Sequence, residues 1–251
     1  MTGQRLCPQR LAAQAQQAGS AFAAASPFPH VVIDDFLPRE QADQLSRSFP
    51  TPDQPIWADW RQRTGHQYGK QGTRNSDQFH LLSDPLYFSL LEFNSSVFLR
   101  FLEAVTGVEA LLPDPYFQGG GLHQIVSGGI LDIHTDFNDY QRLKVYRRLN
   151  VLLYLTEAWT PADGGELELW DGPPPQGRCV KQIAPKFNRL VIFRTDKQSF
   201  HGHTREWQPS DRTRRSIALY FYTSQPEQGQ HYDARTDFQS VVRKDLPISS
   251  T

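Results

Sequence analysis

His134 and Asp136 are separated by a single residue in the stretch GGILDIHTDFNDY, residues 128–140. In a β-strand, side chains at positions i and i+2 point to the same face, about 6.6–6.8 Å apart along the chain. Asp132 would share that face. An imidazole and a carboxylate placed in this way can supply two ligands to a metal that accepts nitrogen and oxygen. The spacing also arises by chance, as a hydrogen-bonded His beside a solvated acid, so a metal site requires further ligands.

The third ligand is expected from the stretch SFHGHT, residues 199–204. His201 follows a predicted strand and is far enough along the chain to lie across a barrel from His134. His203, two residues later, is the alternative ligand.

Arg214 and Ser216 form a second pair, at the start of the apolar run SIALYFY, residues 216–222. On a strand they would share one face. A guanidinium that points into a barrel needs an anionic partner, because burying an unpaired charge is costly and its planar fork fits a carboxylate. A ligand with a carboxylate group would supply that partner.

Composition limits what the whole chain can be. Its 251 residues are enough for one domain with a full core, and 38% hydrophobic and 21% charged residues are typical of a soluble globular protein. The net charge of −1 and the lack of a basic arm give no support to nucleic-acid binding.

Cellular location is also constrained by the sequence. Cys7 and Cys179 have no disulfide or metal-binding spacing, which favours a reducing compartment. Gln14, Gln16 and Gln17 interrupt the Ala-rich N-terminal stretch, so a helix is expected there and not a signal peptide. No run reaches the 18 apolar residues that a membrane span needs. We therefore expect a cytoplasmic protein.

The first half of the chain is expected to be largely helical. Helices are predicted at 9–24, 38–49 and 84–107, the last ending at Gly107, with a strand at 31–37. The polar and aromatic segment 50–80 is interpreted as a lid over a site.

After about residue 115 the pattern changes to period two. Short β-rich runs at 151–155, 164–170, 189–193 and 216–222 are separated by turn residues, with Gly164 and Gly165 forming a tight turn. The predicted fold is α+β with a mainly β core, a small antiparallel barrel or sandwich. We expect one domain: helical support, first strand and lid in 1–114, the β core in 115–223 and a C-terminal tail in 224–251.

Taken together, the motifs resemble those of the iron(II)- and 2-oxoglutarate-dependent oxygenases, in the prolyl-hydroxylase-like branch. The resemblance covers about residues 115–223, and more weakly 28–37. It depends on the order of several short motifs: GGGLHQI, HTD, RRLNVLLYLT, GGELELWD, FNRLVIF, SFHGH and TRRSIALYFY. The fold it implies is a double-stranded β-helix, a jelly-roll or cupin-like barrel with supporting N-terminal helices.

The resemblance also implies roles for individual residues. His134, Asp136 and His201 would bind iron(II), and His201 is preferred over His203 because similar sequences use the first His. Arg214, followed by Ser216 in an Arg-x-Ser pattern, would bind the distal carboxylate of 2-oxoglutarate. Other positions are less specific: Tyr154 would contact the same carboxylate or be an ordinary barrel aromatic, and Asn150, Gln124 and His123 would face the pocket or be structural.

The implied reaction is hydroxylation of an unactivated C–H bond, using iron(II), 2-oxoglutarate and dioxygen, with ascorbate as a supporting reductant. Asp136 argues against halogenation, because halogenases of this fold lack the carboxylate. The expected substrate is an amino acid, a prolyl residue, a peptide or another small metabolite, and no nucleic acid or membrane partner is expected. Basic residues at 142, 144 and 148 would form an outer face or guide an acidic substrate. The oligomeric state is not predicted.

Two alternatives keep the same barrel. A cupin-like zinc hydrolase or isomerase would use the three ligands and a bound water, but it has no need for Arg214 and Ser216. A non-catalytic metal-binding barrel is expected to lack a ligand or the arginine.

Overall fold

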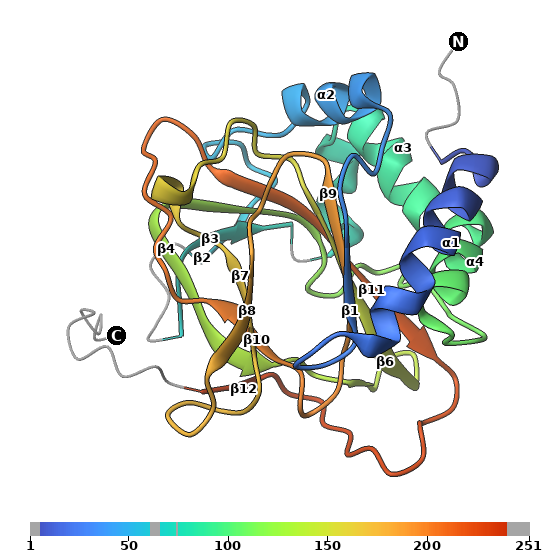
Figure 1. Ribbon diagram of the computed structural model, residues 1–251. Helices are drawn as coiled ribbons and strands as arrows, with labels where there is room; N and C mark the ends of the chain where they lie inside the picture. Colours follow the sequence, from blue (N-terminus) through green and yellow to red (C-terminus); the bar gives the residue numbers. More distant parts are fainter. Residues whose placement is uncertain (1–5, 61–65, 74, 240–251) are drawn as a thin grey trace.

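The computed structural model describes residues 6–60, 66–73 and 75–239. It shows one mainly antiparallel β-sheet curled into a half-barrel, with helices gathered on one side (Figure 1). The helices are α1 Pro8–Ala24, α2 Arg39–Arg47, α3 Asp84–Phe93 and α4 Ser96–Thr106, with 3-10 turns η1 Ser76–Leu81 and η2 Pro161–Asp163. The strands are β1 His30–Ile33, β2 Ala58–Trp60, β3 Gln67–Gly72, β4 Gly121–Thr135, β5 Asp139–Tyr140, β6 Val145–Tyr154, β7 Leu167–Trp170, β8 Cys179–Ile183, β9 Arg189–Arg194, β10 Phe200–His203, β11 Arg214–Thr223 and β12 Asp237–Phe238. The predicted double-stranded β-helix with supporting helices is confirmed.

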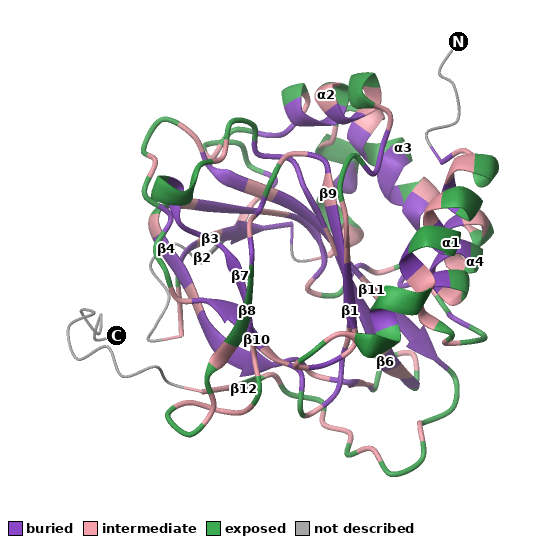
Figure 2. Cartoon of the chain, viewed as in Figure 1, coloured by how far each residue is buried: buried purple, intermediate pink, exposed green. Residues whose placement is uncertain are grey.

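The helices cover the outer face of the sheet because side chains along the strands point alternately outward, into an apolar layer shared with the helices, and inward. Along β6, Val151 and Leu153 belong to the same apolar cluster as Leu11 and Phe22 of α1. Tyr154 belongs to a second cluster with Phe193. The strands are mostly buried, whereas the helices expose their outer sides (Figure 2). Period-two patterning thus leaves inward positions such as Asn150 available for a site.

The long strand β4 forms part of two walls of the barrel. Its first half pairs with β11 and its second half with β10, while β3 pairs with both halves. Between the halves lie Gly128, with φ 78°, and Gly129. A Cβ on Gly129 would lie 2.3 Å from a side-chain carbon of Ile125, so only glycine fits there. The two halves of β4 therefore carry different parts of one interior site.

Segment 50–80 is not a structureless lid in its described part. It contains β2, β3 and η1, and β3 pairs with β4 in register with Lys70 opposite Ile125. Residues 61–65 and 74 lie outside the described residues. The expectation failed because β3, QYGKQG, is polar and contains glycine, both unfavourable in strands. Its pairing with β4 overrides that preference.

Two other expectations need correction. The predicted helix 84–107 is two helices, α3 and α4, with Asn94 at the break donating a hydrogen bond to the Asp114 carbonyl at 2.8 Å. Gly107, with φ 71°, ends α4 as predicted. The C-terminal tail, in its described part, returns to the barrel as β12 and pairs with the end of β4, while 240–251 lie outside the described residues.

Within the described part of the chain, no helix has the length and apolar character to cross a membrane.

Candidate metal centre

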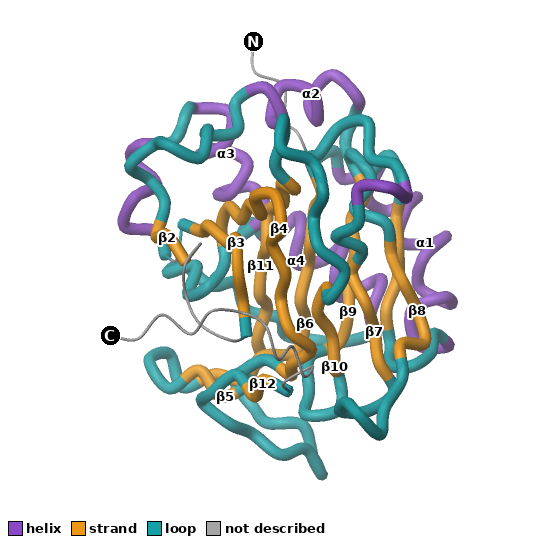
Figure 3. The backbone as a smooth tube through the Cα atoms, turned by 90° about the vertical axis from the view of Figure 1, so that its left-hand side faces the viewer, coloured by secondary structure: helices purple, strands orange, loops and turns teal. Residues whose placement is uncertain are grey.

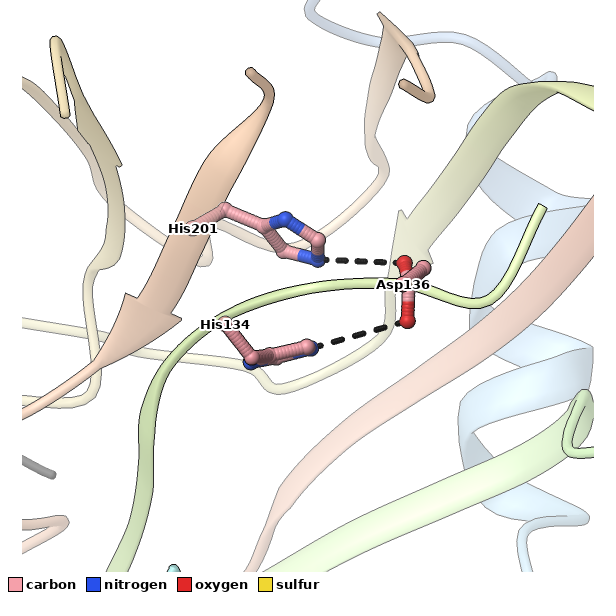
Figure 4. A group of neighbouring side chains, drawn as sticks. All are labelled: His134, Asp136 and His201. Carbon is pink, nitrogen blue, oxygen red and sulfur yellow. Dashed lines mark ion pairs between the residues drawn. The ribbon is translucent and has the colours of Figure 1, made fainter. Parts of the chain in front are cut away.

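Three potential metal ligands meet at one end of the barrel. His134 lies near the end of β4, Asp136 directly follows that strand, and His201 lies on the neighbouring β10, paired with His134 in register. One ligand atom from each lies within 4.8 Å of the others, and all three side chains are largely buried. Figure 4 shows both imidazoles pointing at the Asp136 carboxylate. The structure thus brings together the three residues that the sequence singled out.

The hydrogen bonds of the two histidines show where a cation fits. Nδ1 of His134 contacts the Asp132 carbonyl at 2.8 Å, and Nδ1 of His201 contacts the Ser199 carbonyl at 2.9 Å. A carbonyl only accepts hydrogen bonds, so each Nδ1 carries the proton and a neutral ring keeps a lone pair on Nε2. Those Nε2 atoms face Asp136 oxygens at 3.6 and 3.3 Å. Lone pairs facing a carboxylate at this distance require a cation among them, either a proton or a metal.

The protonation states of His134 and Asp136 favour a metal over a proton as that cation. Burial, helped by the neighbouring His201, lowers the pKa of His134 below its ordinary value, so this ring is neutral near pH 7. Burial alone would raise the pKa of Asp136, but the Arg147 guanidinium and the two imidazoles hold it well below its usual range. Two imidazole nitrogens and one carboxylate oxygen form the facial donor set that suits non-haem iron(II).

Asp136 is held by two donors on one oxygen. Arg147 Nη2 donates to Oδ2 at 3.1 Å, and Asn150 Nδ2 donates to the same atom at 2.7 Å. Asn150 in turn accepts from Arg147 Nε at 2.8 Å and from the Thr195 hydroxyl at 3.0 Å. Asn150 lines the cavity, as one of its expected roles required, but these contacts make it a positioning residue for Asp136.

Arg147 was not singled out by the sequence. Its guanidinium carbon lies 3.4 Å from the ring centroid of Tyr220 and 4.8 Å from that of Phe137, and the residue is 1% exposed. Residues 141–144 form a turn, so β6 begins at Val145 and the expected basic face from 142 to 148 does not form. Arg147 and Arg148 instead point to opposite sides of β6, and Arg147 faces inward.

The ligands open into one cavity of about 270 Å³, which Arg214 also lines. Arg214 Nε donates to the Gly165 carbonyl at 2.6 Å, and Nη2 donates to the Tyr154 hydroxyl at 3.2 Å. A Cβ on Gly165 would lie 2.9 Å from Arg214 Cδ, so the glycine in this turn leaves space for the arginine. Tyr154 is fully buried and contacts the guanidinium, not the cavity itself.

The other expected pocket residues separate into two groups. Ser216 lines the cavity, opposite His123 of β4, which also lines it. Gln124 does not line it: its amide donates to Gln71 and accepts from the Thr213 hydroxyl, each at 2.8 Å, on the other side of β4. The expectation that Gln124 faces the co-substrate is therefore wrong, and His123 is the inward residue.

Lys70 and His203 are further cavity residues. Burial lowers the pKa of Lys70 to about 8. Burial, with Arg214 and Lys70 nearby, holds the pKa of His203 well below its ordinary value, so its ring is neutral. The sequence offered His203 as an alternative ligand, but the group of three ligands contains His201 and not His203. No pattern in the sequence marked Lys70, since its strand was not predicted.

An aromatic ring from outside the barrel core covers His134. Phe238 of β12 pairs in register with His134, and the two ring centroids lie 5.1 Å apart. His66 stacks on Phe238, with ring centroids 5.1 Å apart and an interplanar angle of 12°. Figure 3 shows β12 beside the end of β4 and β10. The C-terminal segment therefore forms one wall of the candidate metal centre.

Comparison with known proteins agrees with this geometry. Residues 120–222 match the family model of the 2OG-Fe(II) oxygenase superfamily, whose members use iron(II), 2-oxoglutarate and dioxygen. The chain is 41% identical over 59 residues to prolyl 3-hydroxylase OGFOD1 of Xenopus laevis. That match spans 22% of this chain and 11% of the frog protein.

Similar solved structures support the fold. A prolyl hydroxylase from Trichoplax adhaerens, solved with a peptide fragment of hypoxia-inducible factor, superimposes with a TM-score of 0.57 at 15% identity, over 85% of this chain and 91% of that one. HygX of Streptomyces hygroscopicus, solved with nickel and 2-oxoglutarate, gives a TM-score of 0.51 at 13% identity, over 88% and 96% of the two chains. Residues 120–222 of the chain are therefore similar to the 2OG-Fe(II) oxygenase superfamily, and the fold is the one that prolyl hydroxylases and related oxygenases share.

Proposed function

We propose that this protein is a dioxygenase that hydroxylates an unactivated C–H bond at the expense of 2-oxoglutarate. The observation that carries the proposal is the placement of the His134, Asp136 and His201 ligand atoms and the Arg214 side chain in one cavity. A metal site alone would fit many enzymes. A buried arginine beside it, already anchored by Gly165 and Tyr154, supplies a place for the carboxylate of a keto acid.

Each residue then has a defined task. His134, Asp136 and His201 would hold the iron, and Arg147 and Asn150 would fix the orientation of the Asp136 carboxylate. Arg214 and Ser216 would bind the distal carboxylate of 2-oxoglutarate, with Tyr154 holding the guanidinium in place. When bound, the iron and 2-oxoglutarate supply the activation of dioxygen that C–H oxidation needs. The buried walls exclude bulk water from that chemistry.

The size of the cavity bears on the substrate. About 270 Å³ lies just below the usual range of small-molecule sites, and metal and keto acid must share it. The remaining space suits a small group, such as an amino-acid side chain or a prolyl ring, with the rest of the molecule outside. We therefore propose an amino acid, a prolyl residue of a peptide or a metabolite of similar size. The frog relative is named a prolyl 3-hydroxylase, which supports the prolyl option. We also propose the cytoplasm as its location, supported by two free cysteines.

The test is an anaerobic titration of the purified protein with iron(II) and then 2-oxoglutarate. A weak charge-transfer band in the visible region is expected for the wild type, no band for His134→Ala and a weaker band for Arg214→Ala. Conversion of 2-oxoglutarate to succinate in air would complete the assignment. Retention of zinc with no band would overturn the proposal in favour of a zinc enzyme.

A further inference from the structure

The cavity carries more positive charge than a single carboxylate contact requires. Among the described residues that line it, Lys70, Arg147 and Arg214 are cations near pH 7 and Asp136 is the one acid. Arg147 is paired with Asp136 through its direct hydrogen bond. A divalent metal at the three ligands would add to the positive charge. The cavity is therefore suited to an anionic ligand with more than one negative group.

Lys70 and Arg214 lie at the same level of the barrel wall. Lys70 of β3 and Arg214 of β11 are both in register with Ile125 of β4, from opposite sides. Two strand spacings separate their backbones by about 10 Å. Both side chains reach the cavity, as does that of Ile125 between them. The long side chains of Lys70 and Arg214 can thus approach each other over Ile125, in the first half of β4. His134 lies near the end of the second half, so this cationic pair is separate from the metal ligands along the strand.

Part of the Arg214 guanidinium is already bound to the protein. Its Nε is engaged by the Gly165 carbonyl, and one Nη2 proton is engaged by the Tyr154 hydroxyl. The edge formed by Nε and Nη2, one of the two edges that can grip a carboxylate bidentately, is therefore already committed to the protein. The Nη1–Nη2 edge is the one left for a ligand, so any second donor to the same carboxylate must come from another residue.

His203 supplies a polar group from a different wall. It lies on β10 in register with Leu131, is 3% exposed and lines the cavity. Neither ring nitrogen makes a hydrogen bond of good geometry within the described part of the chain, although the Arg205 backbone lies close enough to act on the pKa of the ring. A buried polar group without a well-formed hydrogen bond is unfavourable, so such a group in a cavity points to a ligand.

We propose that Lys70 and His203 complete, around Arg214, a binding site for the distal carboxylate of 2-oxoglutarate. The inference rests on the proposed function, because it assigns a ligand to the same cavity. Lys70 would supply a second charge opposite Arg214, and His203 a hydrogen bond from β10. The site would then select a dicarboxylic oxoacid strongly over a monocarboxylic one.

The experiment compares two ligands under anaerobic conditions with the iron(II)-loaded protein. 2-Oxoglutarate and 2-oxopentanoate share the keto-acid end, but the second carries a methyl group in place of the distal carboxylate. Affinities are measured by calorimetry for the wild type, Lys70→Met, His203→Phe and Arg214→Met. Lys181→Met, at an exposed position on β8, is the matched control.

Lys70→Met is expected to weaken 2-oxoglutarate binding about 10- to 100-fold, the usual effect of losing a charge-assisted hydrogen bond. Its affinity for 2-oxopentanoate should stay within about twofold of the wild type, since that ligand lacks the group concerned. His203→Phe should show the same selectivity with a smaller loss, and Lys70→Arg should restore most of the affinity. Lys181→Met should change neither ligand.

Two results would overturn the inference. An unchanged affinity of Lys70→Met for 2-oxoglutarate would show that Lys70 does not bind it. An equal loss for both ligands would place its action at the metal end, or in the fold. These results differ from failure of the proposed function, in which the wild type would not bind 2-oxoglutarate or Arg214→Met would not weaken it.

Discussion

Arg147 and Asp136 form a buried ion pair, 3.1 Å between Nη2 and Oδ2, beside the two imidazoles that the same carboxylate faces. The pair leaves Oδ1 as the carboxylate oxygen without these donors, on the side of His134. Arg147 would thereby favour Oδ1 as the oxygen that Asp136 offers to a metal.

Arg147→Leu is therefore expected to weaken metal binding about 10- to 100-fold, the usual cost of removing a partner of a metal ligand. Without the guanidinium, burial raises the pKa of Asp136 and its orientation is no longer fixed. Competition with a chromophoric chelator for iron(II) or cobalt(II) measures the change. Arg148→Leu is the control, because Arg148 pairs with Glu227 on the other side of β6. Metal affinity equal to that of the wild type in Arg147→Leu would refute this role.

Metal should stabilise the folded protein measurably. At a free metal concentration 100 times the dissociation constant, the gain is about 2.7 kcal/mol, or about 5–10 °C in Tm for a chain of this size. Calorimetric scans with and without cobalt(II) should show this shift in the wild type and in His80→Ala, whose histidine is exposed. Asp136→Ala should show almost none. A similar shift in Asp136→Ala would mean that the metal binds elsewhere.

Lys70 is expected to destabilise the ligand-free protein. Its pKa in the folded state, about 8, lies below its ordinary value of 10.5, so the folded state disfavours the charged form. That cost is fully present below about pH 8 and disappears as pH rises towards 10.5. Because the side chain is partly exposed, we expect Lys70→Met to raise the free energy of unfolding by about 1–3 kcal/mol at pH 7.

Urea unfolding of both proteins at pH 7 and pH 10 measures this effect. The difference between variant and wild type should shrink at the higher pH. A lower free energy of unfolding in Lys70→Met, or a difference that does not depend on pH, would show that the charged Lys70 ammonium group does not destabilise the folded state.

Phe238 should protect the metal centre. Phe238→Ala removes a ring that contacts both His134 and His66, and we expect metal to be lost to excess chelator several-fold faster. Asp237→Ala, on the same strand with an exposed side chain, should behave like the wild type. Equal rates in the two variants would remove Phe238 from the barrier to metal release.

The parts of the site that the sequence predicted are those set by local geometry. The spacing of His134 and Asp136 follows from period two, and Arg214 and Ser216 both line the cavity because they alternate with outward residues of one strand. The same alternation located Asn150 on the inner face, although not its contact with Asp136. Their roles in binding remain predictions.

The parts that were missed depend on pairing between distant segments. Lys70 reaches the cavity because β3 pairs with β4, some fifty residues later in the chain, and its own strand sequence favours a loop. Gln124 was given a cofactor-facing role, but it bonds to Gln71 and Thr213, and no motif in the sequence marked which of the adjacent residues His123 and Gln124 faces inward. Phe238 is placed by a two-residue strand that carries no periodic signal.

Phe238 makes the outer wall of the site depend on a strand of two residues. His134, Asp136, His201 and Arg214 all precede β12 in the chain and are positioned by the longer pairings among β4, β10 and β11. Detachment of β12 would therefore open the site without dismantling it.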